Sequence, residues 1–380
     1  MSDAAAGRSR AWGWVAHLRA GGTTQWSQWQ GSAAPGGRVL PGAAQLELVR
    51  RLHLTAPAGA SVPAALVERV LAATPAGRAP AEYELVGAEH DVRFGLPAVD
   101  PSALPDEELL RTAAHLVAQD LVALGPVPRS VGRPRPWRPR VRVAGDPWLR
   151  SELQRRLPEH GHPPRRRSRV VVVGAPLPVM LADAWTHACF ERAAIGWEEW
   201  LEQWRESGGL PPGVGIAAIA QRWAARVGRD RVQVVVDETQ LPAALGRSLP
   251  RAARREGNLV RRPGRPSAAL ARRVAVSLDL LAPVAEHRSL LRDGLLPRLP
   301  DDCFDTGLPV LPPEHRGWVT ERGDRVAARL RRAGYAVAPR QWAPDGPGTP
   351  VDTPPLTGGG ASGALDLALR LLRSEWRGQE

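Results

Sequence analysis

The sequence predicts an α/β protein in which a parallel sheet flanked by helices follows a helical N-terminal domain. Two observations support this prediction. Between residues 140 and 341, short β-branched runs alternate with segments of helical periodicity, and the run 170–173 consists of four valines. Uninterrupted apolar strands are typical of parallel sheets that are covered on both faces. Before residue 128, apolar residues recur mainly at helical spacing.

Residues 1–128 are predicted to form a small helical bundle. Segment 43–52 carries its leucines and valine on one face and its charged residues on the other. A second helix is predicted for 105–124. Pro105 and the three acidic residues after it suit a helix start, and the Gly-Pro pair that begins at Gly125 ends the helix.

Residues 129–139 are rich in arginine and proline, cannot be helical, and are predicted to be a linker. The α/β domain then covers 140–341. Its expected strands are 141–144, 170–173 and 232–236, and its expected helices are 147–157, 179–193, 198–206, 216–227, 268–281, 283–293 and 313–332.

The chain is predicted to end in a mobile linker and an amphipathic helix. Residues 342–363 are dominated by proline, glycine and threonine. Residues 364–380 carry a stripe that includes Leu365, Leu369, Leu372 and Trp376, with arginines elsewhere. Such a helix is expected to dock on a protein partner or on an anionic membrane surface.

The charge of the chain is uneven. All 51 cationic residues are arginine, which is typical of a GC-rich genome and excludes every mechanism that needs a lysine. Segment 129–167 holds 12 arginines against 3 acidic residues, and segment 247–273 holds 9 against 1. This clustering favours an anionic small molecule or glycan as partner. The alternative is that these arginines are simply solvated in loops. It argues against nucleic acid, because no helix-turn-helix, zinc or RNP pattern accompanies the charge.

Two cysteines far apart, and histidines without metal-ligand spacing, indicate neither a disulfide framework nor a metal site. The N-terminal residues lack the apolar stretch of a signal peptide, and no window resembles a membrane span. The sequence therefore predicts a cytoplasmic protein.

One candidate anion site follows the first expected strand. Ligands of open parallel sheets bind beyond the carboxyl ends of the strands. Gly145 allows a tight turn there, and the helix that begins at Pro147 offers free N–H groups to an anion. In the alternative interpretation, Asp146 only caps that helix. After the third strand, Asp237 and Glu238 hold a base or a cation, or else form a solvated acidic pair.

A second candidate anion site is the loop 20–24. Gly22 is expected to expose its N–H group, Thr23 and Thr24 to donate hydroxyl groups, and Arg19 to add charge. The alternative is an ordinary turn.

His187 is the candidate general base. It follows Asp183 by four residues, so on a helix the carboxylate is placed to orient the imidazole. The alternative is an ordinary pair of surface side chains.

Three stretches resemble the sulfotransferase-like proteins of actinobacteria. They are RVVVVGAPLPVMLADAWTHACFERAAIGWEEWLEQW (169–204), IAAIAQRWAARVGRDRVQVVVDE (216–238) and LPPEHRGWVTERGDRVAARLRRAGYAVA (311–338). The resemblance covers about the C-terminal 60% of the chain. It implies a P-loop-like α/β fold that transfers a sulfuryl group from 3′-phosphoadenylyl sulfate to a hydroxyl or amine, on a glycan or a small metabolite.

The resemblance also implies roles for individual residues. His187 would be the base, oriented by Asp183. The 5′ end of the donor would be held by Arg19 with the loop of Gly22, Thr23 and Thr24, or by the loop of Gly145. Its 3′-phosphate would be reached by one or more of four arginines: Arg254, Arg255, Arg261 or Arg262. The alternative function is a non-catalytic protein that retains the fold and binds an anion or an assembly partner.

Overall fold

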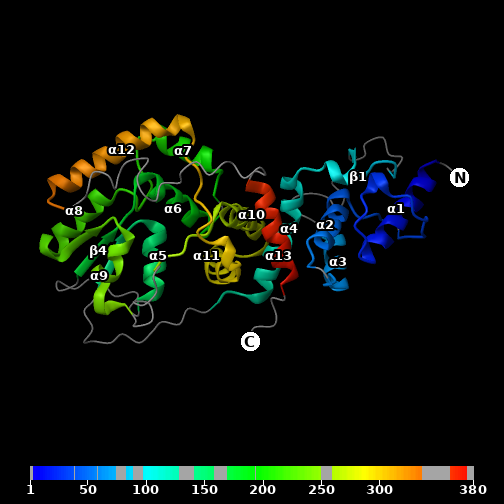
Figure 1. Ribbon diagram of the computed structural model, residues 1–380, viewed down its shortest axis with the longest axis horizontal. Helices are drawn as coiled ribbons and strands as arrows, with labels where there is room; N and C mark the ends of the chain where they lie inside the picture. Colours follow the sequence, from blue (N-terminus) through cyan, green and yellow to red (C-terminus); the bar gives the residue numbers. More distant parts are fainter. Residues whose placement is uncertain are drawn as a thin grey trace. The chain divides into compact units, whose positions relative to one another are not determined.

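The computed structural model describes residues 3–37, 39–57, 59–73, 83–88, 97–127, 141–157, 169–192, 194–249, 259–335 and 360–374 (Figure 1). The protein is mostly helical and contains small parallel sheets, so the expected α/β class is confirmed in this broad sense. The chain divides into two compact units. The first unit contains Met1–Val127, Ala269–Leu299 and Thr357–Glu380, and the second contains Pro128–Ala268 and Pro300–Leu356.

The first unit therefore combines three separate stretches of sequence. Its main helices are α1 (Asp3–Arg19), α2 (Ala43–Leu54), α3 (Ala64–Leu71), α4 (Asp106–Leu124), α11 (Val284–Arg288), α13 (Gly360–Arg373) and most of α10 (Arg265–Leu281). A π-helical segment, Ser289–Leu295, follows α11. Two short strands, β1 (Glu84–Leu85) and β2 (Ala98–Val99), pair in parallel. The helix predicted at 105–124 is confirmed as α4, with Pro105 at its N-cap.

The last helix packs within the first unit. Helix α13 lies against α4 and also contacts α2. Leu365, Leu369 and Leu372 of the predicted stripe are buried, and so are Leu367 and Leu371. The apolar face that the sequence offers to a partner is thus covered by the chain itself. The helix begins at Gly360, inside the stretch predicted as a linker; Trp376 and the linkers 129–139 and 342–359 lie outside the described residues.

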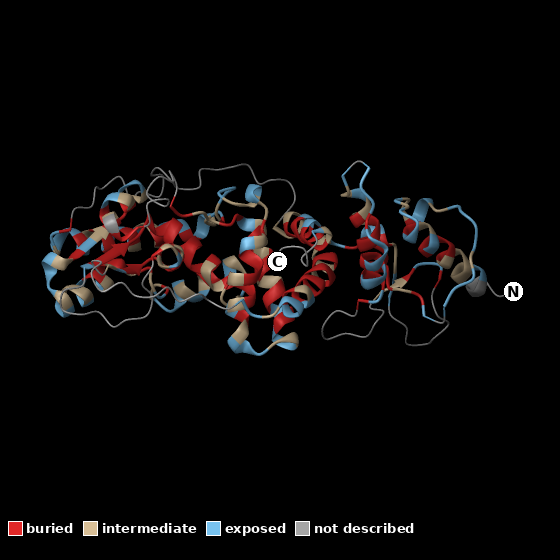
Figure 2. Ribbon diagram, turned by 90° about the horizontal axis from the view of Figure 1, so that it is seen from below, coloured by how far each residue is buried: buried red, intermediate tan, exposed pale blue. Residues whose placement is uncertain are grey.

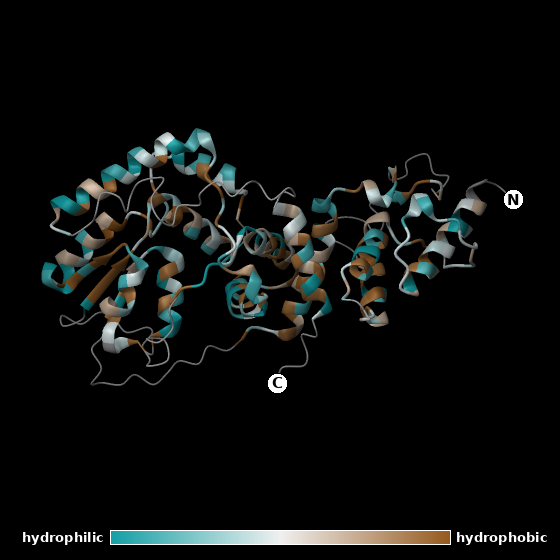
Figure 3. Cartoon of the chain, in the orientation of Figure 1, coloured by the Kyte–Doolittle hydropathy of each residue, from teal (hydrophilic) through white to brown (hydrophobic). Residues whose placement is uncertain are grey.

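The second unit is built on a three-stranded parallel sheet in the order β3 (Val141–Gly145), β4 (Arg169–Val173) and β5 (Val232–Val235). The three strands lie close to the predicted positions. All four valines of β4 are fully buried, because β4 is the central strand. Figure 2 shows the strands as mostly buried and Figure 3 shows them as hydrophobic.

Helices connect and cover the strands. They are α5 (Pro147–Arg156), α6 (Leu177–Cys189), α7 (Trp197–Glu206), α8 (Ile216–Val227), the short α9 (Leu241–Leu245) and α12 (Pro313–Arg332). Helix α5 packs on β3 and α6, and α8 packs on β4 and β5. The alternation of strands and helices predicted from the sequence is confirmed here.

Trp197, Trp200 and Trp204 share one face of α7, as their helical spacing predicts. Neighbouring ring centroids of this row lie 5.8 and 6.1 Å apart, and the row continues to Trp185 on α6. Trp200 is buried, and the indole N–H of Trp197 donates to the carbonyl of Val310. The row serves packing inside the second unit.

None of the helices in the described ranges combines the length and the hydropathy that crossing a bilayer requires.

Candidate functional site

Three carboxylates and one arginine form a buried polar centre in the second unit. Asp146 directly follows β3, Glu238 lies three residues after β5, and Asp183 belongs to α6. Arg262 joins them from the segment that precedes α10. We call these four residues the carboxylate centre. Two of its members stand at the carboxyl ends of strands, where parallel sheets usually bind ligands.

Asp146 is completely buried and is held by the local backbone. Its Oδ1 accepts a hydrogen bond from Leu149 N at 2.9 Å and caps α5. Its own N–H donates to the carbonyl of Val173 and extends the ladder between β3 and β4. In the described structure Asp146 Oδ2 has no hydrogen-bond partner. The capping role considered from the sequence is therefore confirmed, and it leaves one buried oxygen unsatisfied.

Gly145 is fixed by its conformation and by its neighbour. Its φ is +105°, and a Cβ built on it would lie 2.0 Å from the carbonyl oxygen of Val173. Only glycine allows the chain to leave β3 in this direction while it stays close to β4.

Arg262 binds two carboxylates with its planar guanidinium. Its Nε lies 2.8 Å from Asp183 Oδ1, and its Nη2 lies 2.9 Å from Asp183 Oδ2. On Glu238, Nη1 donates to Oε2 at 3.1 Å and Nη2 donates to Oε1 at 2.5 Å. The main-chain N–H of Arg262 also donates to Asp305 Oδ1. Such paired contacts are the strongest geometry available to an arginine.

The charged groups of this centre shift one another's pKa values. Burial raises the pKa of Asp146 well above its ordinary value, and the charge of Asp183 raises it further. Burial also raises the pKa of Asp183, although Arg262 lowers it in part. Burial alone would lower the pKa of Arg262, but Asp183 and Glu238 raise it well above its ordinary value. Both buried aspartates are therefore harder to ionise than an exposed aspartate.

The chemistry of the centre is limited by its burial. Asp146 and Asp183 are at most 1% exposed, and the side chain of Glu238 is 33% exposed. Within the described ranges, no three His, Cys, Asp or Glu side chains come together in a way that could hold a metal ion. The arrangement ties α6, the end of β5 and the segment around Arg262 together.

A cavity of about 450 Å³ lies elsewhere in the second unit, against strand β3. Strand β3 contributes the residues from Arg142 to Gly145 to its lining, and helices α5 and α8 contribute most of the rest. Four arginines line it: Arg142, Arg150, Arg222 and Arg226. We call it the arginine cavity. Ile219, Trp223 and Pro212 supply apolar surface to the same space.

The four arginines have no carboxylate partner among the residues that the structure describes. Two of them instead lie over an aromatic ring: the Cζ atoms of Arg142 and Arg226 are 5.0 and 5.6 Å from the ring centroid of Trp223. Cation–π attraction offsets part of the repulsion between neighbouring guanidinium groups. The cavity therefore concentrates positive charge that no acidic side chain of the described protein neutralises.

The predicted anion loop 20–24 lies in the first unit, at the end of α1. Gly21 N donates to the carbonyl of Leu18, and Gly22 N donates to that of His17. These N–H groups close the helix, as in a common glycine C-terminal cap. The carboxyl end of a helix carries partial negative charge, so this position does not favour an anion.

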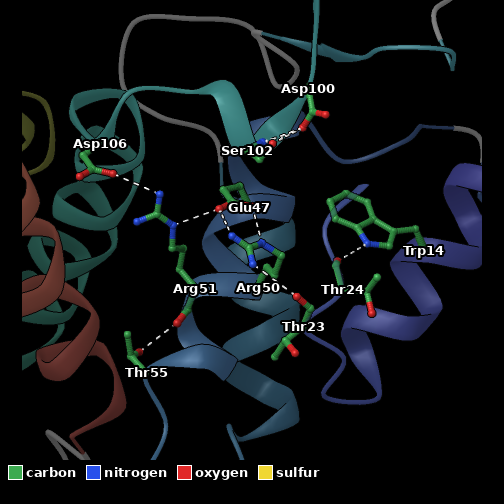
Figure 4. Close-up of polar contacts among 10 residues, drawn as sticks. All are labelled: Trp14, Thr23, Thr24, Glu47, Arg50, Arg51, Thr55, Asp100, Ser102 and Asp106. Carbon is green, nitrogen blue, oxygen red and sulfur yellow. Dashed lines mark hydrogen bonds and ion pairs between the residues drawn. The ribbon is translucent and has the colours of Figure 1, made fainter. Parts of the chain in front are cut away.

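Figure 4 shows that the threonines of this loop take part in hydrogen bonds with neighbouring side chains of the first unit. The carbonyl of Thr24 accepts from Trp14 Nε1 at 2.9 Å, and that of Thr23 accepts from Arg50 Nη1 at 3.3 Å. The hydroxyl of Thr24 lies 3.1 Å from His17 Nε2. Arg19 pairs with Glu68 at 2.7 Å. These contacts are those of an ordinary turn, which is the alternative that the sequence also allowed.

The other predicted donor-binding residues are dispersed. Gly145 lines the arginine cavity, Arg262 belongs to the carboxylate centre, and Arg261 pairs with the exposed Asp301 at 2.8 Å. Arg254 and Arg255 lie outside the described residues. The predicted phosphate-binding group of arginines is therefore not assembled from Arg261 and Arg262, since both bind carboxylates.

The predicted pair of Asp183 and His187 lies on α6 at the expected spacing. The Asp183 carboxylate is bound by Arg262, and His187 Nε2 lies 3.6 Å from Glu191 Oε1, one turn further along the chain. Asp183 is thus engaged by a cation rather than available to orient a base.

The arginines of the cavity do not stand out in the sequence. Arg142 and Arg150 lie within a broad basic segment, and no motif marks Arg222 or Arg226. The available signal was the spacing on α8, where Ile219, Arg222, Trp223 and Arg226 share one face.

Comparisons of the chain with protein-family models, with curated proteins and with solved structures gave no match.

Proposed function

We propose that this protein binds a multiply charged anion in the arginine cavity. The observation that carries the proposal is the convergence of Arg142, Arg150, Arg222 and Arg226 on one space of about 450 Å³ without an acidic partner among the described residues. Guanidinium groups remain charged across the physiological pH range and bind carboxylate, sulfate and phosphate groups with two parallel hydrogen bonds. An anion in the cavity relieves the repulsion between these four cations.

The surrounding charges favour the arginine cavity, rather than the carboxyl edge of the sheet, as the site for an anion. There, Asp146, Asp183 and Glu238 surround the single cation Arg262, which already binds two of them. An anion placed at that edge meets more negative than positive charge. In the arginine cavity the balance is reversed, and its volume falls in the range of ordinary ligand pockets.

Titration calorimetry with inorganic pyrophosphate at low ionic strength tests the proposal. The double variant Arg222→Gln/Arg226→Gln removes two of the four charges from the exposed face of α8. We expect its affinity for pyrophosphate to fall at least about tenfold, since charge-assisted hydrogen bonds contribute about 1.5–3 kcal/mol each.

The matched control is Arg205→Gln. Arg205 is an exposed helical arginine of the same unit, but it pairs with Glu202 on α7, away from the cavity residues. Its substitution should leave the affinity unchanged. Equal affinity in the double variant and in wild type would contradict the proposal, and so would equal losses in the double variant and in the control.

Sulfuryl transfer from 3′-phosphoadenylyl sulfate stays a prediction that depends on the resemblance alone. It requires the protein to bind 3′-phosphoadenosine 5′-phosphate, the product of the donor. Binding that exceeds the affinity for pyrophosphate, and that survives Arg222→Gln/Arg226→Gln, would support a separate donor site. Absence of binding at millimolar concentration would rule out the transferase.

A further inference from the structure

Two arginines of the arginine cavity lie over the ring of one tryptophan, Trp223. Arg142 belongs to β3 and Arg226 to α8, and their Cζ atoms are 5.0 and 5.6 Å from the centroid of the ring. Arg226 follows Trp223 by three residues, so the helix itself brings these two side chains together. Arg142 reaches the ring because α8 also contacts β3. Trp223 therefore joins one cation of the sheet to one cation of the helix.

Trp223 is held in place by packing, whereas the two arginines are not. The tryptophan is half-buried on α8, and this helix packs on the central strand β4. Both arginines are exposed, and neither has a carboxylate partner among the described residues. An exposed arginine without a partner samples many rotamers, and two such cations repel each other. The face of an indole ring attracts cations, so it draws both guanidinium groups to one place.

The shared ring limits how far apart the two guanidinium groups lie. Both Cζ atoms are measured from the same centroid, so their separation cannot exceed the sum of the two distances. Two linked phosphoryl groups, each bound by one guanidinium, span a comparable length, since charge-assisted hydrogen bonds are about 2.7–2.9 Å long. An anion with one charged centre is bound by one guanidinium through two hydrogen bonds. It does not require a second guanidinium at a set distance.

From this geometry we propose that Trp223 is a positioning residue, which holds Arg142 and Arg226 as a pair that selects ligands with two linked anionic groups, such as a diphosphate. The inference rests on the proposed function, because it assigns a ligand class to the same cavity. Arg150 and Arg222 add positive charge to that cavity.

The ring acts on the free protein, before the ligand binds. With the ring present, the two arginines are already gathered, so a diphosphate does not have to order them. Without the ring, binding must restrict both side chains and bring two cations together, and this cost lowers the affinity. An anion with one charged centre has to order fewer side chains. Loss of the ring should therefore weaken the binding of a diphosphate more than that of a single phosphate.

The test is titration calorimetry of the full chain with pyrophosphate and with inorganic phosphate at low ionic strength. Trp223→Leu removes the ring but keeps apolar bulk and the charge of the cavity, and leucine is a good helix former. We expect the affinity for pyrophosphate to fall at least about fivefold, since two cation–π contacts are lost, and that for phosphate to change less than about twofold. Circular dichroism checks the fold, and Trp223→Met, also a good helix former, replaces the leucine variant if that variant does not fold.

Two further variants distinguish positioning from a merely structural role. Trp223→Phe retains an aromatic face and should keep the preference for pyrophosphate. In the background Arg142→Gln/Arg226→Gln, Trp223→Leu should have no further effect, because the residues through which it acts are gone. The matched control is Trp204→Leu. Trp204 is a half-buried tryptophan of α7 that packs against Trp200, and its substitution should leave both affinities unchanged.

The outcomes separate this inference from the proposed function. If pyrophosphate binds but the aliphatic variants of Trp223 match wild type, or lose affinity for both anions equally, the inference is wrong and the anion-binding proposal stands. The same holds if Trp223→Leu has its full effect in the background without Arg142 and Arg226. If wild type does not bind pyrophosphate, both are wrong.

Discussion

Arg262 holds Asp183 through three hydrogen bonds, from Nε to Oδ1 at 2.8 Å, from Nε to Oδ2 at 3.0 Å and from Nη2 to Oδ2 at 2.9 Å, and the carboxylate is 1% exposed. The two residues are 79 positions apart in the sequence. This pair fixes the segment before α10 against α6. Asp183 and Arg262, which the sequence suggests for catalysis and donor binding, therefore hold the fold together.

Loss of the Arg262 side chain should destabilise the second unit strongly. In Arg262→Met, Asp183 stays buried without its cation, and breaking a buried pair costs about 3–5 kcal/mol. Arg261→Met is the control, because Arg261 pairs with Asp301, which is 91% exposed, and should cost about 1 kcal/mol or less. Urea unfolding followed by circular dichroism measures both. Similar losses in the two variants would contradict the assigned role of the pair.

Asp146 should make stability fall as pH rises. Burial raises its pKa in the folded protein above the unfolded value, so the folded state binds more protons between these two values. Stability from this group is complete below the unfolded pKa, near 4, and is lost as pH rises through the folded pKa.

The variant Asp146→Asn isolates this effect. Asparagine retains an oxygen for the cap on Leu149 and cannot ionise. In urea titrations we expect its stability relative to wild type to increase as pH rises above the unfolded pKa, near 4, and to level off once Asp146 is ionised in the folded protein. A difference between the two proteins that does not change with pH would show that Asp146 ionises at its ordinary pKa.

Gly145→Ala should disrupt the junction of β3 and β4. The added Cβ would lie 2.0 Å from the carbonyl oxygen of Val173 at a φ of +105°, and backbone atoms cannot yield as a side chain does. We expect a loss of at least about 3 kcal/mol in unfolding free energy, or failure to fold.

The comparison variant for this substitution is Gly317→Ala. Gly317 lies within α12, where no neighbouring atom comes within 4 Å of an added Cβ. Alanine there should stabilise the helix by about 0.5–1 kcal/mol, because glycine is a poor helix former. Thermal unfolding of both variants should therefore shift in opposite directions.

Glu47→Gln should destabilise the first unit. Glu47 is 1% exposed and binds Arg50 at 2.7 Å and Arg51 at 3.0 Å (Figure 4). Removal of its charge leaves Arg50, which is 9% exposed, without its partner, and should cost about 3 kcal/mol.

Glu68→Gln serves as the matched control for Glu47. Glu68 also binds an arginine, Arg19, at 2.7 Å, but both side chains are about half exposed. Water screens such pairs, so the change should stay within about 1 kcal/mol. Equal effects of the two substitutions in urea unfolding would show that burial does not determine the strength of these pairs.

The sequence by itself determined the local elements of the fold. The apolar run of β4 and the helical spacing of α8 and α12 each specify one conformation through neighbours only a few residues away, and their boundaries agree with the prediction. Pro105 before α4 and Gly125 after it likewise set the two ends of that helix through their own backbone preferences. The presence of a parallel sheet followed from this alternation.

Only the tertiary structure decided which side chains meet. Arg262 lies 79 residues from Asp183 and 24 from Glu238, and the arginines of the cavity come from β3, α5 and α8. No periodicity encodes such distances, because they depend on how strands and helices pack. The placement of Ala269–Leu299 and α13 with the N-terminal region has the same origin. Buried contacts between segments far apart in sequence fix it, and local patterns do not report such contacts.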